Sequence, residues 1–305
     1  MRNRVKVMFF VFTLCLCASL CAGRDAQAKI KRGKWKDNIS WSYDTNKKEL
    51  VLTGNGKIQE AVSRDDKYPD FPKWELFAHK VKSVRIEGKI THTSPFLAGA
   101  GGFTNMTRLK LSDTLKVIES HSFWDARKII SVKLPVGLRK IKASAFEGTG
   151  LRQVTIPSKV KKIGNQSFSS CYNLKTAIVK EGVEVVGMGA FWDCNKLTKV
   201  VLPNSITKLM GVSFCTTALE KVIIPKNVEE IGNAAFAQAS VEEATLKKVT
   251  IKSKKVKKWG KDIFADAHKE LVIYVPKCKK AEYEKALRSK GLPTYVKVVG
   301  KKSLE

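Results

Sequence analysis

Apolar residues recur at a fixed period through the middle of the chain. Phenylalanine returns every 22 or 23 residues, at Phe123, Phe146, Phe168, Phe191, Phe214 and Phe236. Eleven residues before four of these rings stands a proline, which closes a run of alternating apolar and polar residues, as in residues 151–156. A second, shorter apolar step follows the proline, as in residues 160–163. This self-similarity is typical of a solenoid, in which one small unit stacks on the next.

The alternating runs predict short strands, since successive side chains of a strand point to opposite faces. One strand and one turn cannot bury an apolar face alone, so we expect the units to stack and their strands to form a parallel sheet. Proline has no N–H for the ladder and therefore marks the end of pairing. The phenylalanines should fill the core, one ring in each layer. The core markers are Phe123, Phe146, Phe168, Phe191, Phe214, Phe236 and, after an insertion, Phe264.

The strand pattern occurs nine times between residues 81 and 276, counting looser matches at both ends and including a run at residues 129–134. Both flanks carry other patterns. Residues 38–44 and 49–56 alternate like the two strands of a hairpin that turns at residues 44–46, with Trp41 and Tyr43 on one face. Residues 277–290 predict a helix that stops at Gly291. We expect both flanks to act as caps, because an open solenoid exposes apolar layers at its ends.

The repeated unit Leu-x-x-Val-x-Ile-Pro-x-x-Val-x-x-Ile-Gly-x-x-x-Phe resembles the BspA-type leucine-rich repeat of exported bacterial proteins. The resemblance covers residues 81–276, and both flanks are similar to the end modules of that family. It implies a mostly β, α+β fold: a leucine-rich-repeat solenoid of about nine short parallel strands, with an N-terminal β-hairpin module and a C-terminal capping helix. Ser112, Lys180 and Lys252 depart from the pattern at proline positions.

The N-terminus reads as an export signal. Arg2, Arg4 and Lys6 precede an apolar run over residues 7–20, and residues 26–28 form an Ala-x-Ala cleavage site. We therefore expect a cleaved signal peptide at 1–28, an N-terminal module at 29–80, the solenoid at 81–276 and a basic cap at 277–305. The mature chain is expected to have no transmembrane segment and to be secreted or associated with the cell surface.

The chain is strongly basic, with 57 Lys and Arg against 28 Asp and Glu and a net charge of +29. The predicted signal removes four bases and one acid, which leaves +26, and residues 247–305 alone carry +12. This charge indicates either a solvated surface or retention on an anionic wall or glycan. Export and the lack of an aromatic-basic motif argue against nucleic acid as the partner.

Few residues suggest catalytic or metal chemistry. Cys171 and Cys194 both lie three residues after a repeat phenylalanine, where other units carry Thr149 and Thr217. Either a small buried side chain or a disulfide between layers would suit this position. His121 falls at a position of varied residue type, which suggests a surface location. No Cys/His pair or zinc-ligand set emerges, so we predict no catalytic residue, no metal and no cofactor.

A ligand is expected to contact the outward side of the predicted strands. Two outward columns run from layer to layer. The first column is Ser83, Arg108, Ser131, Gln153, Thr176, Lys199, Lys221 and Lys248, and the second is Arg85, Lys110, Lys133, Thr155, Ile178, Val201, Ile223 and Thr250. The β-branched residues at 178, 201 and 223 are either good strand formers or a recognition patch beside a basic one. The candidate ligand-facing residues are Arg85, Arg108, Lys110, Lys133, Thr155, Thr176, Ile178, Lys199, Val201, Lys221 and Ile223.

The resemblance implies a noncatalytic exported protein that binds or adheres to macromolecules, with a host or matrix protein or a glycan as ligand. Charge supports an alternative, a polyanion- or cell-wall-binding protein held by its basic surface. A secreted hydrolase is the third interpretation, because the members of a Ser-His-Asp triad need only meet in space.

Overall fold

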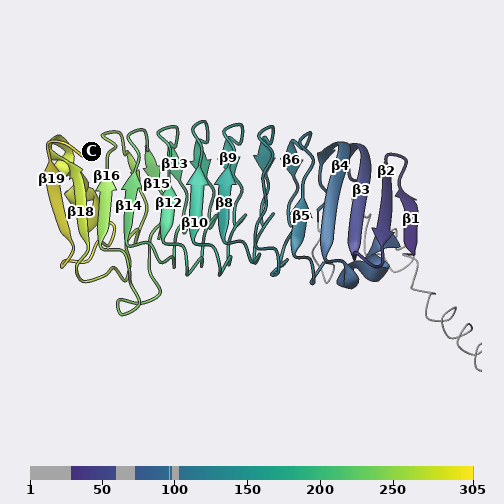
Figure 1. Cartoon of the computed structure of the whole chain (residues 1–305). Helices are drawn as coiled ribbons and strands as arrows, with labels where there is room; N and C mark the ends of the chain where they lie inside the picture. Colours follow the sequence, from purple (N-terminus) through teal and green to yellow (C-terminus); the bar gives the residue numbers. More distant parts are fainter. Residues whose placement is uncertain (1–28, 60–72, 96, 98–102, 305) are drawn as a thin grey trace, which may run out of the picture.

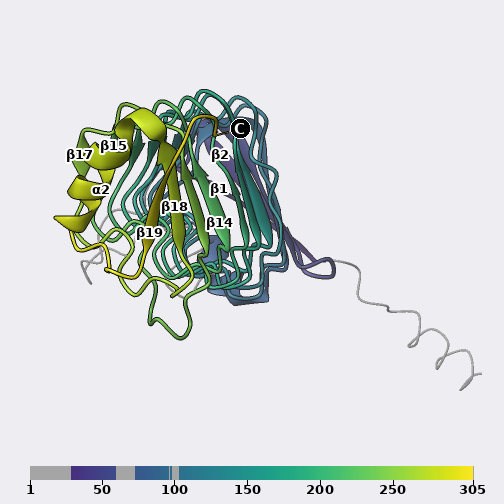
Figure 2. The same ribbon diagram turned by 90° about the vertical axis from the view of Figure 1, so that its left-hand side faces the viewer.

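The computed structural model describes residues 29–59, 73–95, 97 and 103–304, so the predicted signal peptide lies outside the described residues. The chain forms a β-solenoid, with its strands arranged in chain order along one long axis (Figure 1). Figure 2 shows the C-terminal end of this solenoid, where strands line two different sides of the coil.

The N-terminal end is an antiparallel meander of β1 (Ile30–Trp35), β2 (Ile39–Asp44) and β3 (Glu49–Lys57). The predicted hairpin corresponds to β2 and β3, and its turn is held by Asp44 Oδ1, which accepts hydrogen bonds from the N–H groups of Asn46 and Lys47 at 2.9 Å each. The strand β1 was not predicted from the sequence. A parallel pairing then joins β3 to β4 (Ser83–His92), where the solenoid begins.

The core-side face of the meander is covered by a 3-10 helix, η1 (Lys73–Lys80). The Tyr43 ring stacks on Phe77 with centroids 4.3 Å apart, and the Trp41 ring meets Trp74 edge-on at 6.4 Å. All four side chains are buried. Trp41 and Tyr43 therefore share one face of β2, as its alternation predicts.

Most layers of the solenoid contribute two strands. The longer strands are β5 (Arg108–Lys110), β8 (Gln153–Ile156), β10 (Thr176–Val179), β12 (Lys199–Val201), β14 (Lys221–Ile224) and β16 (Lys248–Ile251). The shorter strands are β6 (Val117–Ile118), β7 (Lys140–Ile141), β9 (Lys162–Ile163), β11 (Val185–Val186), β13 (Lys208–Leu209), β15 (Glu230–Ile231) and β17 (Lys258–Trp259). All these pairings between layers are parallel.

The coil thus has two strand-bearing sides rather than the single sheet expected. The short strands continue one sheet from β4 to β17, whereas the longer strands pair as β8–β10–β12 and as β14–β16–β18, where β18 is Val272–Pro276. We call the outward side of the short strands the short-strand face. The outward side of the longer strands, from β4 and β5 to β18, is the long-strand face. Residues 129–134, predicted as a strand, form none in the structure; a backbone hydrogen bond from Arg152 N–H to Ile130 C=O still ties them to the next layer.

The core between the two faces is built around a column of stacked phenylalanines. Seven rings, from Phe123 to Phe264, follow one another with centroids 5.2 to 5.8 Å apart and planes within 21° of parallel. None of these rings is more than 2% exposed. Backbone bonds hold this register, as when Phe168 N–H donates to Ala190 C=O at 2.9 Å.

Each phenylalanine sits in a turn with left-handed backbone two residues before it. Residues at this position have φ between 48° and 59°: His121, Ser144, Gln166, Gly189, Val212, Ala234 and Asp262. His121 is half-buried and its ring meets Trp124 edge-on, while Ser144 is fully buried. The varied composition of this position therefore does not mark a uniformly exposed surface; what its members share is the backbone conformation.

The C-terminal end carries the predicted helix and one further strand. After β18 (Val272–Pro276), a 3-10 turn η2 (Lys277–Lys279) leads into α2 (Lys280–Arg288), and β19 (Lys297–Lys301) returns to pair in parallel with β18. The helix lies at this end of the coil (Figure 2). Its Tyr283 hydroxyl accepts from Val256 N–H at 3.1 Å and donates to Ser253 C=O at 3.3 Å. The helix is therefore anchored to the last repeat.

Candidate functional site

The register of the paired strands determines which candidate residues are neighbours on the long-strand face. Arg85 is in register with Lys110 at the N-terminal end. Ile178 lies between Thr155 and Val201 in the central sheet. At the C-terminal end Lys221 is directly opposite Lys248. The columns thus follow the layers, with the central and C-terminal parts belonging to separately paired sheets.

Exposure differs among the candidate residues. Arg85, Thr176 and Ile178 are half-buried. The exposed ones are Arg108, Lys110, Lys133, Thr155, Lys199, Val201, Lys221 and Ile223. Of the remaining column members, Ser83 and Thr250 are buried. Thr250 lies between the larger residues Ile223 and Tyr274 in the ladder.

The central part of the face is apolar. Val201 is 42% exposed and Ile223 is 52% exposed, while the half-buried Ile178 pairs directly with Val201. Toward the N-terminal end, a hollow of about 700 Å³ opens beside Lys133 and Thr155. At the N-terminal edge, Arg85 is already engaged, because its Nε lies 3.3 Å from a Glu87 carboxylate oxygen and 3.7 Å from one of Glu49.

The C-terminal part of the face is basic and aromatic. The Tyr274 ring is contacted by two ammonium groups, Lys248 Nζ at 5.3 Å and Lys301 Nζ at 5.0 Å from its centroid. Lys297 lies on β19, opposite Val272 of β18. Sequence reasoning missed Tyr274, Lys297 and Lys301 as part of this surface. Continuing the strand alternation through residues 272–276 would have found Tyr274, whereas the two lysines depend on β19.

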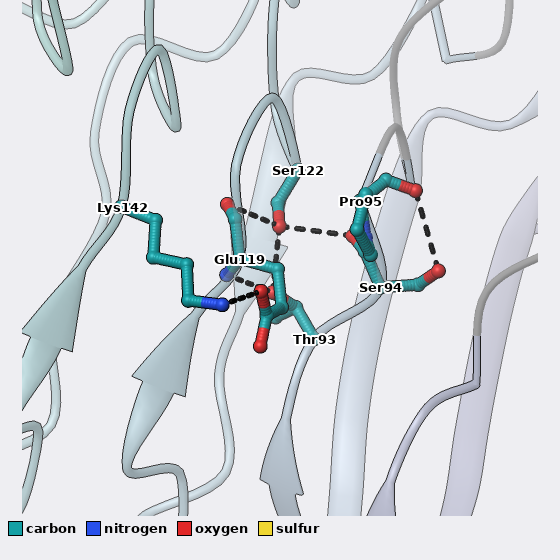
Figure 3. Close-up of polar contacts among 6 residues, drawn as sticks. All are labelled: Thr93, Ser94, Pro95, Glu119, Ser122 and Lys142. Atoms are coloured by element: carbon teal, nitrogen blue, oxygen red, sulfur yellow. Dashed lines mark hydrogen bonds and ion pairs between the residues drawn. The ribbon is translucent and has the colours of Figure 1, made fainter. Parts of the chain in front are cut away.

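A buried polar cluster lies where β4 meets the first repeats (Figure 3). Glu119 N–H donates to Thr93 Oγ1 at 2.8 Å, and the Thr93 and Ser122 hydroxyls are 2.6 Å apart. The Glu119 carboxylate lies 2.5 Å from Lys142 Nζ. Thr93 and Ser122 are completely buried, so neither hydroxyl can meet a substrate. The cluster satisfies buried polar groups at the start of the solenoid.

At Thr149, Cys171 and Cys194, the side chain three residues after a repeat phenylalanine donates a hydrogen bond to a backbone carbonyl. Cys171 Sγ donates to Phe146 C=O at 3.2 Å and Cys194 Sγ to Phe168 C=O at 3.1 Å, as Thr149 Oγ1 also donates to Phe146 C=O at 2.9 Å. Cys171 and Cys194 are free and fully buried. Burial raises the pKa of the Cys194 thiol.

Two further observations concern the described residues alone. In that part of the chain no three His, Cys, Asp or Glu side chains gather in a way that could hold a metal ion. Nor does any helix described there have the length and apolar character needed to cross a membrane.

The repeat can now be compared with known families. A model of the BspA type leucine rich repeat region matches residues 101–216 and 208–285, in 6 copies. The chain belongs to the BspA-type leucine-rich repeat family. No curated protein matches its sequence.

Among solved structures, this BspA-type chain is similar to three bacterial proteins. A leucine-rich repeat protein from Bacteroides ovatus is 19% identical, with a TM-score of 0.50 over 86% of this chain and 76% of the other. One from Eubacterium ventriosum is 16% identical (TM-score 0.43, 81% and 78%). The pneumococcal vaccine antigen PcpA is 15% identical (TM-score 0.43, 90% and 99%). The first likeness shows a shared solenoid fold.

Proposed function

We propose that this BspA-type protein is exported and noncatalytic, and that it binds a macromolecular partner at the cell surface through its long-strand face. The observation that carries the proposal is the exposed pair Val201 and Ile223 beside the lysines 199, 221 and 248. Apolar side chains gain by leaving water when a partner covers them. The flanking lysines would steer an acidic partner and fix its orientation.

The partner that best suits this combination is a protein with an acidic surface. Apolar contact supplies the buried centre of such an interface, and charged residues suit its rim. The export signal predicted at residues 1–28 supports a location of the mature chain outside the cell.

The test uses the mature chain, residues 29–305, on an array of matrix proteins and glycans, followed by affinity measurements on each binder. Val201→Asp with Ile223→Asp should weaken binding at least about thirtyfold, the loss that defines an interface hot spot. The control is Leu76→Asp, at a residue of η1 that is 80% exposed and lies away from the long-strand face. Unchanged affinity in a folded double variant would overturn the assignment of this face.

A second candidate function is retention on a polyanion or anionic cell wall. The Lys248–Tyr274–Lys301 arrangement and the net +12 of residues 247–305 favour it. Binding carried by charge should collapse at high ionic strength, whereas an interface with an apolar centre should keep most of its affinity. Measuring retention on isolated walls at low and high salt separates the two. A hydrolase has no comparable observation in its favour.

A further inference from the structure

The short-strand face carries a hollow over β7 and β9 that is lined by bases without acids. Its volume is about 860 Å³, which is far larger than one phosphate ion fills. Six of its lining residues are bases, and none is acidic. The six are Arg139, Lys140, Lys142, Lys159, Lys161 and Lys162.

Two of these bases already have partners. Lys142 Nζ lies 2.5 Å from the buried Glu119 carboxylate (Figure 3), and Lys161 Nζ lies 2.7 Å from Glu184 Oε1. For the other four, no described acidic group lies within ion-pair distance. Arg139, Lys140, Lys159 and Lys162 therefore leave four uncompensated positive charges around one hollow.

The strand register places two of these charges side by side. Ile141 of β7 is in register with Ile163 of β9, so Lys140 and Lys162 are direct neighbours on the outward side. Strands lie about 4.8 Å apart, and like charges directly opposite one another are destabilising. An anion between these ammonium groups would remove that repulsion.

The same face is compensated further along the solenoid. Glu230 of β15 lies between two lysines, 3.7 Å from Lys208 Nζ and 3.9 Å from Lys258 Nζ. Positive charge is therefore not a general property of the short-strand face. It is left unpaired at β7 and β9.

Gly164 lines the hollow where the chain passes directly against the preceding layer, since a Cβ atom there would lie 2.4 Å from the Lys142 carbonyl oxygen. Beside it, Asn165 Oδ1 accepts a hydrogen bond from Met188 N–H at 3.2 Å, which leaves the Asn165 amide NH2 to donate. Ser120 and Ser158 add hydroxyl groups to the lining. The hollow thus offers positive charges and hydrogen-bond donors, which suits a ligand rich in acceptor oxygens.

We propose that this hollow binds a polyanionic polymer that carries phosphate or sulfate groups. A tetrahedral oxyanion can bridge Lys140 and Lys162, while Arg139 and Lys159 contact a neighbouring anionic group of the same polymer. The site lies on a different face from the one proposed for the macromolecular partner and is independent of that proposal.

The test is a titration of the mature chain with three polymers at about 0.15 M salt: heparin for sulfate, poly(glycerol phosphate) for phosphate, and polyglutamate for carboxylate. Lys140→Glu with Lys162→Glu should weaken binding of heparin or poly(glycerol phosphate) at least about tenfold. It should also lower the slope of log affinity against log salt by about two. The matched control is Lys34→Glu with Lys73→Glu, which changes net charge equally at exposed positions outside the hollow, the long-strand face and residues 247–305 and should cost less than about twofold.

Each outcome bears on the proposal. Binding of heparin alone or of poly(glycerol phosphate) alone supports the site and names its anion. Equal losses in both double variants, stronger binding of polyglutamate, or no binding of either oxyanion polymer overturns it. Circular dichroism checks that the variants fold, and unchanged binding of the long-strand-face partner shows that the two sites fail separately.

Discussion

At the scale of single residues, the repeat dictates a side chain only where neighbouring layers touch. Phe168 is fully buried between Phe146 and Phe191, with ring centroids 5.4 and 5.5 Å away. Three residues later the requirement is for a small donor, which either Cys or Thr meets. Two residues earlier it is a left-handed backbone, so side chains as different as Gln166 and Val212 occur.

The central ring should be the costliest to remove. Phe168→Ala leaves a cavity and ends both stacking contacts, so we expect the free energy of unfolding to fall by about 3–5 kcal/mol. Urea denaturation followed by circular dichroism measures this. The control Tyr172→Ala, at an exposed aromatic in the same layer, should stay within about 0.5 kcal/mol of the parent. A loss below about 1 kcal/mol at Phe168 would contradict a closely packed column.

The cysteines should differ in reactivity in the order of their exposure. Cys278 is exposed, Cys215 is half-buried, and Cys171 and Cys194 are fully buried. Thiolate is the reactive form, and the raised pKa of Cys194 keeps that thiol protonated in the folded chain at pH 8. A thiol reagent should label Cys278 first and reach Cys171 and Cys194 only after unfolding. Finding two free thiols in the unreduced, unfolded mature chain, instead of four, would show that the layers are cross-linked.

At the scale of elements, close backbone approach decides the shape of the coil. The short strands end at glycines such as Gly164, Gly187 and Gly232, where the chain passes directly against the preceding layer. A side chain at these positions would push the layers apart. Each layer therefore lies at the same distance from the one before it. Strand pairing can then continue from layer to layer on both faces of the coil.

Gly187→Ala should therefore destabilise the fold. The new Cβ would lie 2.5 Å from Ile163 C=O, a backbone atom that cannot move alone, and overpacking of this kind costs about 1–3 kcal/mol. Gly137→Ala is the matched control, because its nearest contact at 2.9 Å is the flexible end of the Lys116 side chain. Thermal unfolding of both variants measures the difference. Equal melting temperatures would show that the layers can separate without cost.

At the scale of the whole molecule, positive charge exceeds its compensation. The chain has a net charge of +29, while acids such as Glu184 and Glu230 each pair with only one or two lysines. Self-repulsion of this kind destabilises a compact state. The solenoid moderates it by spreading the charge along a long axis.

Added salt should consequently stabilise the mature chain. Raising NaCl from about 0.05 to 0.5 M shortens the screening length, and each recovered 1 kcal/mol should raise Tm by about 2–4 °C. Differential scanning calorimetry measures this, and KBr at the same ionic strength controls for ion-specific effects. A fall in Tm with both salts would mean that surface ion pairs outweigh the repulsion.

The sequence by itself determined the solenoid, its period and the phenylalanine column, because each layer of a repeat protein contacts mainly its neighbours and repeats their pattern. Strands of two residues, such as β7 and β9, are too short to show an alternation, so the second face emerged only from the tertiary structure. The strands β1, with six residues, and β19, with five, do not alternate between apolar and polar residues and were also missed. Which lysines have acidic partners was also decided there: Lys208 has Glu230 one layer away, whereas Lys140 and Lys162 face each other. Such pairing depends on register between layers, 22 or 23 residues apart in the chain, and only the folded coil brings those residues together.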